Sequence, residues 1–170
     1  MVIKAIFFDL GDTIIIEEDQ DKRLWEADLR KLPYVDDVLA ELKRRNYMIG
    51  LITNTTTSKE IHVRAALRKL NIEHYFDVVI TSVDVGVEKP NEEIFINALG
   101  RINVKPWEAV MVGNRISKDI VGANKVGMIS VLIKWRNKYR EEALTDLEKP
   151  KHEISSLIEL VEILNKLEKT

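Results

Sequence analysis

Short apolar runs alternate along the chain with longer stretches in which hydrophobic residues recur at helical spacing. The runs have the length of buried strands, and several of the longer stretches begin with a capping Ser, Asp or Asn. This alternation is typical of a parallel sheet covered by helices. Strands are predicted at 3–9, 47–53, 76–82, 109–113 and 128–133, and helices at 35–45, 58–70, 91–102, 117–127 and 155–168. The pattern predicts one doubly wound, Rossmann-like α/β domain spanning residues 1–170, without internal repeats.

Polar side chains gather where the predicted strands end. In a doubly wound fold, ligands bind beyond the carboxyl ends of the strands, so these residues are expected to share one edge of the sheet. Carboxylates, hydroxyls, amides and an ammonium group together suit a phosphate and a hard cation. The candidates are Asp9 and Asp12, Thr53 and Asn54, Lys89, and Asn114 with Asp119.

Composition removes several classes of function. The net charge of −2 gives no global attraction to nucleic acid or to an anionic membrane, and the absence of cysteine excludes disulfides, thiolate metal sites and a cysteine nucleophile. The apolar run that ends at Asp9 is too short for a membrane span, so a cytoplasmic protein is expected. The basic cluster "KWRNKYR" at 134–140 is interpreted as solvated surface rather than as a nucleic-acid site.

Four motifs, "FFDLGDT", "LITN", "EKP" and "VGNRISKDI", occur in this order at the ends of successive predicted strands. With them the chain resembles the haloacid dehalogenase-like (HAD) superfamily, most of whose members are magnesium-dependent phosphatases. The resemblance implies that Asp9 is a nucleophile that forms an aspartyl-phosphate. It also implies that Thr53, with Asn54 beside it, binds the phosphoryl group and that Lys89 neutralises its charge. Mg²⁺ would be held by Asp9, the backbone carbonyl of Gly11, Asn114 and Asp119.

Two positions depart from the family pattern, which usually reads Asp-x-Asp-Gly-Thr. Gly11 stands where the family has the acid–base Asp, so slow turnover is expected, with Asp12 as the nearest candidate to replace that acid. Asn114 stands where the family usually has a metal-binding Asp, which should weaken magnesium binding. A magnesium-dependent phosphoester hydrolase is therefore preferred. The alternative is a catalytically weakened HAD-like domain that serves as a binding or regulatory module.

Substrate choice in the family depends largely on an inserted cap domain. The gaps after the first and third predicted strands are too short for a full cap, so the site is expected to be open. An open site favours a large phosphorylated substrate, such as a phosphoprotein, or shielding by a homodimer. A short helix is expected within 21–32, where Leu24, Trp25 and Leu29 would form an apolar side. A dehalogenase is disfavoured because no cap would enclose an alkyl halide.

Overall fold

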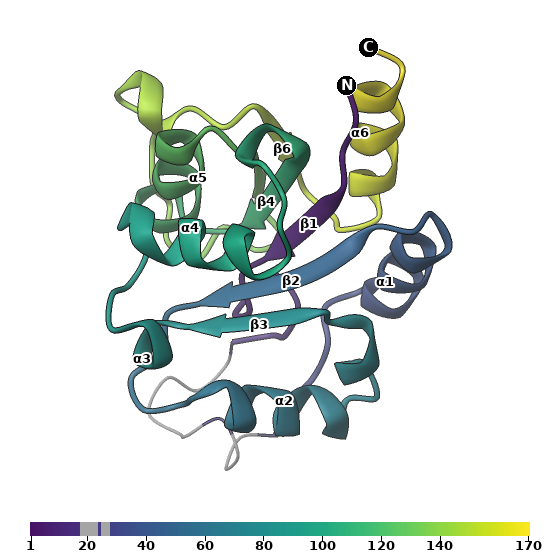
Figure 1. The fold of residues 1–170 in the computed structure, drawn as a ribbon, viewed down its shortest axis with the longest axis vertical. Helices are drawn as coiled ribbons and strands as arrows, with labels where there is room; N and C mark the ends of the chain where they lie inside the picture. The colour runs from purple at the N-terminus through teal and green to yellow at the C-terminus, as the bar shows by residue number, and fades with distance from the viewer. Residues whose placement is uncertain (18–23, 25–27) are drawn as a thin grey trace.

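The computed structural model describes residues 1–17, 24 and 28–170, and its centre is a six-stranded parallel sheet (Figure 1). The strand order is β3-β2-β1-β4-β5-β6, so the chain winds outward from β1 in both directions. This order is that of a doubly wound sheet, and the predicted fold class is confirmed. The strands are β1 (Ala5–Phe8), β2 (Met48–Thr53), β3 (Val78–Thr81), β4 (Ala109–Gly113), β5 (Ile129–Ile133) and β6 (His152–Ile154).

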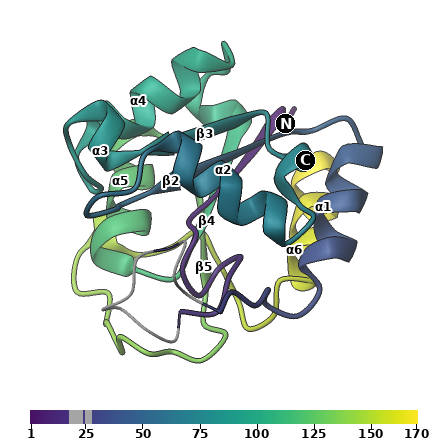
Figure 2. The same ribbon diagram turned by 90° about the horizontal axis from the view of Figure 1, so that it is seen from below.

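Helices cover both faces of the sheet, and Figure 2 shows α4 and α5 on the opposite side from α1 and α6. One hydrophobic core joins the sheet to α1, α2 and α6, and a second joins it to α4 and α5. The result is a three-layer α/β/α structure. The helices are α1 (Val35–Arg44), α2 (Glu60–Lys69), α3 (Ser82–Val85), α4 (Glu92–Arg101), α5 (Val121–Val126) and α6 (Glu159–Glu168).

Strand β1 shows why apolar runs of this kind become central strands. All four of its residues are buried, because side chains alternate between the two faces and both faces are covered by helices. Ile6 and Phe8 point into the core under α1, α2 and α6, whereas Ala5 and Phe7 point into the core under α4 and α5. The strand therefore delivers Asp9 at its carboxyl end as a rigidly placed residue.

The structure differs from the predicted elements at β6, at the predicted helix 117–127 and at α3, which begins at Ser82, the last residue of a predicted strand. Strand β6 was not predicted, since its three residues follow a polar segment and are too few to show a period. The predicted helix at 117–127 is a turn of π-helix, η3 (Ile116–Ile120), followed by α5. The helix expected within 21–32 falls mostly on residues outside the described part of the chain, Trp25 included.

The described residues between β1 and α1, and those between β3 and β4, form no additional domain, so the expectation of no full cap is confirmed for the part of the chain in view.

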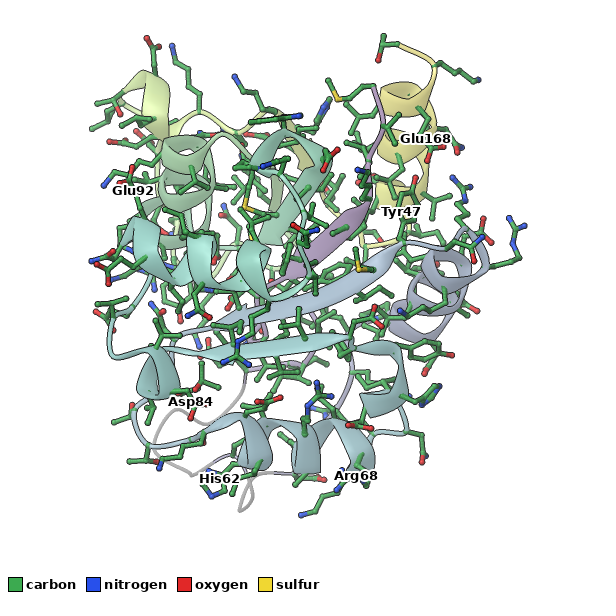
Figure 3. All side chains as sticks on the ribbon, in the orientation of Figure 1. Tyr47, His62, Arg68, Asp84, Glu92 and Glu168 are labelled. Carbon is green, nitrogen blue, oxygen red and sulfur yellow. The ribbon has the colours of Figure 1, made fainter. Side chains whose placement is uncertain are left out.

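Near the amino end of β2, Tyr47 donates a hydrogen bond to Glu168 of α6, and Figure 3 shows the two side chains together. None of the helices in the described ranges is long and apolar enough to span a bilayer.

Candidate active site

A pocket of about 840 Å³ opens at the carboxyl edge of the sheet. Its lining draws on the segments that follow β1, β2 and β4, together with the segment that precedes α4. All the predicted site residues except Asp12 line it: Asp9, Gly11, Thr53, Asn54, Lys89, Asn114 and Asp119. Residues separated by up to 110 positions in the sequence thus meet where the topology of a doubly wound sheet places a ligand.

Lys89 is the electrostatic centre of the pocket. Its side chain is 2% exposed, and Nζ donates to Asp9 Oδ1 at 2.8 Å, to Asp119 Oδ1 at 2.7 Å and to the carbonyl of Ile52 at 2.7 Å. Three acceptors satisfy the three N–H groups of the ammonium. Burial alone would lower the pKa of Lys89, but the carboxylates of Asp119 and Asp9 outweigh it and raise the pKa. The lysine therefore stays charged although it is withdrawn from water.

Asp119 lies on η3, completely buried beside Lys89. Its Oδ2 accepts a hydrogen bond from the backbone N–H of Arg115 at 3.0 Å, so both of its oxygens have partners. Burial, reinforced by the nearby Asp9 carboxylate, raises the pKa of Asp119 to about 6, while Lys89 opposes the rise. A side chain at Gly113 would begin only 2.3 Å from Asp119 Cγ, so the glycine that ends β4 makes room for this carboxylate. In this arrangement Asp119 is the counter-ion of Lys89.

Asp9, Gly11 and Asn114 form a second cluster on the other side of the Asp9 carboxylate. One terminal atom of the Asn114 carboxamide lies 3.1 Å from Asp9 Oδ2 and 3.3 Å from the Gly11 carbonyl oxygen. If this atom is the nitrogen, it donates to both oxygens; if it is the oxygen, three oxygens converge with no hydrogen between them. Neighbouring ligands in the octahedral shell of Mg²⁺ are about 3 Å apart, because each lies about 2.1 Å from the ion. With the oxygen in this place the cluster fits such an ion, whereas with the nitrogen there Asn114 ties Asp9 to the Gly11 carbonyl.

This cluster offers one carboxylate, one carbonyl and one carboxamide. Within the described ranges, no group of three or more His, Cys, Asp or Glu residues is arranged to hold a metal ion. The candidate metal site therefore carries little negative charge of its own, and Asp119 could reach an ion there only by giving up a present partner or through a bridging water.

Thr53 and Asn54 both line the pocket, but their neighbours differ from those that the motif suggested. The Asn54 side chain brackets the backbone of Lys89: Nδ2 donates to the Lys89 carbonyl at 3.0 Å, and the Lys89 N–H donates to Oδ1 at 2.8 Å. Asn54 therefore positions Lys89, whereas Thr53, at the end of β2 and 4% exposed, remains available at the pocket wall.

Two backbone amides at the amino end of α2 are engaged within the chain. The N–H of Glu60 donates to Asp84 on α3 at 2.8 Å, and the N–H of Lys59 donates to His62 Nδ1 at 3.0 Å. Figure 3 shows Asp84 beside the start of α2, near His62. The wall after β2 is built by a run of hydroxyl side chains at 55–58.

Asp12 lies in the same loop as Asp9 but does not line the pocket. Its backbone is left-handed, with φ of 52°, which an aspartate tolerates better than most residues. Oδ1 accepts from the N–H of Glu17 at 2.9 Å and Oδ2 pairs with Arg136 Nε at 2.9 Å. Asp12 is thus a buried carboxylate that pairs with the partly exposed Arg136 and holds the loop, which is not the place expected of a catalytic acid.

The pocket also contains charged or polar residues that were missed at the sequence level, among them Glu17, Arg115, Lys118 and Tyr139. Arg115 and Lys118 were within reach of prediction, because both belong to the "VGNRISKDI" motif. Glu17 and Tyr139 carried no such signal. They are 122 residues apart in sequence, yet the Tyr139 hydroxyl donates to Glu17 Oε2 at 2.9 Å.

The basic segment 134–140 is explained by the same contacts. Arg136 pairs with Asp12 and also donates to the Glu17 carbonyl, while Lys138 Nζ lies 3.4 Å from Glu17 Oε2. Lys134 pairs with Glu153 as well, so three cations of the segment have carboxylate partners within the chain.

The sheet order and the Asp9–Lys89–Asp119 centre define a Rossmann-like protein whose ligand site lies at the carboxyl edge of the sheet. Comparison with known proteins then gives the family: its model, described as haloacid dehalogenase-like hydrolase, matches residues 6–133. The chain belongs to this family.

Curated relatives carry phosphatase names. The chain is 40% identical over 144 residues to a glyceraldehyde 3-phosphate phosphatase of Methanopyrus kandleri, covering 84% of this chain and 60% of the relative. It is 44% identical over 105 residues to a protein of the same name from Methanothermobacter thermautotrophicus, covering 62% of this chain and 45% of the relative. The chain thus spans about half the length of these two relatives.

Solved structures share the fold. A HAD phosphatase from Thermococcus onnurineus superposes with a TM-score of 0.77 at 26% identity, covering 95% of this chain and 98% of that one. An uncharacterized protein from Listeria monocytogenes serotype 4b reaches a TM-score of 0.88 at 24% identity, covering 99% of this chain and 100% of that chain.

Proposed function

We propose that this protein is a magnesium-dependent phosphatase that hydrolyses a small phosphorylated metabolite through an aspartyl-phosphate on Asp9. The observation that carries the proposal is the placement of Asp9. Its carboxylate is 14% exposed at the pocket, and Lys89 neutralises one of its oxygens from the buried side. A carboxylate held in this way can reach a phosphoryl group and tolerate that group's negative charge.

The chemistry proceeds in two displacements. In the first, a carboxylate oxygen of Asp9 bonds to phosphorus while the bond from phosphorus to the ester oxygen breaks, and the leaving alkoxide takes a proton from an acid–base group of the pocket. In the second, water bonds to phosphorus, the Asp9–phosphorus bond breaks and the water gives a proton back to that group. Lys89 stabilises the charge in both displacements, and Thr53 contacts a phosphoryl oxygen. Mg²⁺ would withdraw charge from the transferring group. Asp9, the Gly11 carbonyl and Asn114 would hold the ion, and Asp119 would contact it through a bridging water.

The substrate class follows from the pocket and from the relatives' names. A volume of about 840 Å³ lies within the range of small-molecule sites. The two curated relatives named above are, by their names, phosphatases of a small phosphorylated compound, glyceraldehyde 3-phosphate. The expected macromolecular substrate finds no support in these names, and neither does the expected homodimer. Glyceraldehyde 3-phosphate is therefore the first compound to test.

The test is phosphate release from a panel of small phosphate esters, with Mg²⁺ and with a chelator, for the native protein and for Asp9→Asn. We expect turnover that needs the metal and is lost in Asp9→Asn. Acid quenching during turnover should trap a phosphorylated peptide that contains Asp9, detectable by mass spectrometry. A native protein that binds inorganic phosphate but hydrolyses no ester and forms no phosphorylated peptide would instead be a binding or regulatory module.

A further inference from the structure

Gly11 leaves the proposed phosphatase site without the acid–base carboxylate that the family pattern has at this position, yet the backbone there does not require a glycine. The glycines with left-handed backbone are Gly86 and Gly127, and Gly11 is not among them. A side chain at position 11 would therefore cause no backbone strain. The absence of a side chain needs another explanation.

The space beside Gly11 is occupied by the carboxylate of Glu17. A Cβ atom at position 11 would lie 3.2 Å from Glu17 Cδ and 3.3 Å from Glu17 Oε1. The loop brings the two residues together by folding back: the Asp12 N–H donates to the Ile15 carbonyl at 2.7 Å, and the Ile15 N–H donates to the Leu10 carbonyl at 3.1 Å. Position 11 is two residues after Asp9. Glu17 thus places a carboxyl group where the side chain of residue 11 would begin.

We propose that Glu17 is the acid–base residue of this active site and replaces the carboxylate that position 11 lacks. The assignment rests on the proposed phosphatase function. In the first displacement Glu17, carrying a proton on Oε1, gives that proton to the ester oxygen as the bond from phosphorus to that oxygen breaks, while Oε2 keeps its contacts with Tyr139 and Lys138. In the second, the Glu17 carboxylate takes a proton from the attacking water as the Asp9–phosphorus bond breaks. Glu17 ends the cycle protonated, as it began.

The contacts of Glu17 suit this role. Oε2 accepts from the Tyr139 hydroxyl at 2.9 Å and lies 3.4 Å from Lys138 Nζ, and the backbone N–H donates to Asp12 at 2.9 Å. Glu17 is thereby held at both its backbone and one carboxylate oxygen. The other oxygen, Oε1, is directed toward Gly11. The side chain is 32% exposed and lines the pocket, so a substrate or a water molecule can reach it.

Asp12, the other candidate for the acid, is excluded by its contacts. Both of its oxygens are engaged, and it does not line the pocket. In the assignment made here, Asp12 and Arg136 are positioning residues because they hold the backbone of Glu17.

The experiment compares two kinds of leaving group in Glu17→Gln, which keeps the size and one acceptor oxygen but has no proton to give. With glyceraldehyde 3-phosphate, whose alkoxide needs a proton, kcat/KM should fall about 10²-fold or more. With 4-nitrophenyl phosphate, whose leaving group needs no proton, the initial burst of nitrophenolate should keep its rate. The phosphorylated enzyme should then decay more slowly, so that it accumulates. Glu142→Gln, which removes an exposed carboxylate outside the pocket, is the matched control and should change neither.

A double variant tests whether the two positions are interchangeable. Gly11→Asp alone should not raise turnover, because Glu17 already occupies the space that the new side chain needs. The double variant Gly11→Asp/Glu17→Ala should hydrolyse alkyl phosphates at least tenfold faster than Glu17→Ala alone. A merely structural role for Glu17 predicts no such recovery.

The outcomes separate this assignment from the phosphatase proposal itself. If the native protein turns over and Glu17→Gln keeps its kcat/KM for glyceraldehyde 3-phosphate within threefold, Glu17 is not the acid and the assignment alone fails. It also fails if Glu17→Gln slows the nitrophenolate burst as strongly as the alkyl reaction. A native protein with no turnover and no burst on any substrate overturns the phosphatase proposal, and this assignment with it.

Discussion

Lys89→Met should destabilise the protein by about 3–5 kcal/mol, which is the usual cost of removing one partner of a buried ion pair. Two hydrogen bonds to carboxylates are lost, to Asp9 at 2.8 Å and to Asp119 at 2.7 Å, and hydrogen bonds to charged groups contribute about 1.5–3 kcal/mol each. Methionine fills a similar volume, so the loss reflects charge rather than a cavity. What remains is the fully buried Asp119 carboxylate without its ion-pair partner.

The free energy of unfolding is measured by urea titration followed by circular dichroism. Lys125→Met, which removes an exposed lysine on α5, serves as the control and should stay within about 0.5 kcal/mol of the native protein. In Lys89→Met/Asp119→Asn the buried carboxylate is neutralised, so this double variant should be about 2 kcal/mol more stable than Lys89→Met, within the usual range of coupling between contacting residues. A loss below 1 kcal/mol in Lys89→Met, or strictly additive effects in the double variant, would refute the view that Lys89 stabilises Asp119.

Two further predictions concern the loop residues around the pocket. Asn114→Asp should tighten Mg²⁺ binding in calorimetric titration, because a second carboxylate joins Asp9 and the Gly11 carbonyl; identical affinities in the two proteins would argue that position 114 is not a ligand. Asp12→Asn should lower the free energy of unfolding by about 1.5–3 kcal/mol through loss of the ionic hydrogen bond to Arg136, yet cost far less turnover than Asp9→Asn. A stably folded but inactive Asp12→Asn protein would return Asp12 to the list of acid candidates.

The part of the site that the sequence predicted consists of residues at the ends of strands. Asp9 and Thr53 directly follow or end buried apolar runs, and a parallel sheet brings such ends to one edge whatever the details of the connections. For the same reason five of the six strands and the order of the main helices could be predicted. Periodicity carries this information because it reports burial, which the layers of the fold impose on every strand.

The rest depended on contacts that leave no local pattern. Glu17 and Asp12 are both acids of one short loop, and the sequence alone made Asp12 the nearer candidate to Asp9. The left-handed backbone at Asp12 and the fold-back of residues 10–15 reverse that choice, because they direct Asp12 to Arg136 and Glu17 to Gly11. The role of Asn54 was hidden similarly, since its partner is the backbone of a residue 35 positions away.

The link between Glu17 and the segment 134–140 has a consequence for the order in which the protein can be assembled. Arg136 contacts Asp12 across 124 residues of chain, and Tyr139 contacts Glu17 across 122. Because such distant residues meet late, we expect these contacts to form only after β5 has paired with β4. During synthesis, Asp9 and Lys89 can meet as soon as the chain up to α4 has left the ribosome, but Glu17 is not yet fastened. A nascent chain can therefore bring Asp9 to Lys89 before the carboxylate beside Gly11 is fixed in place.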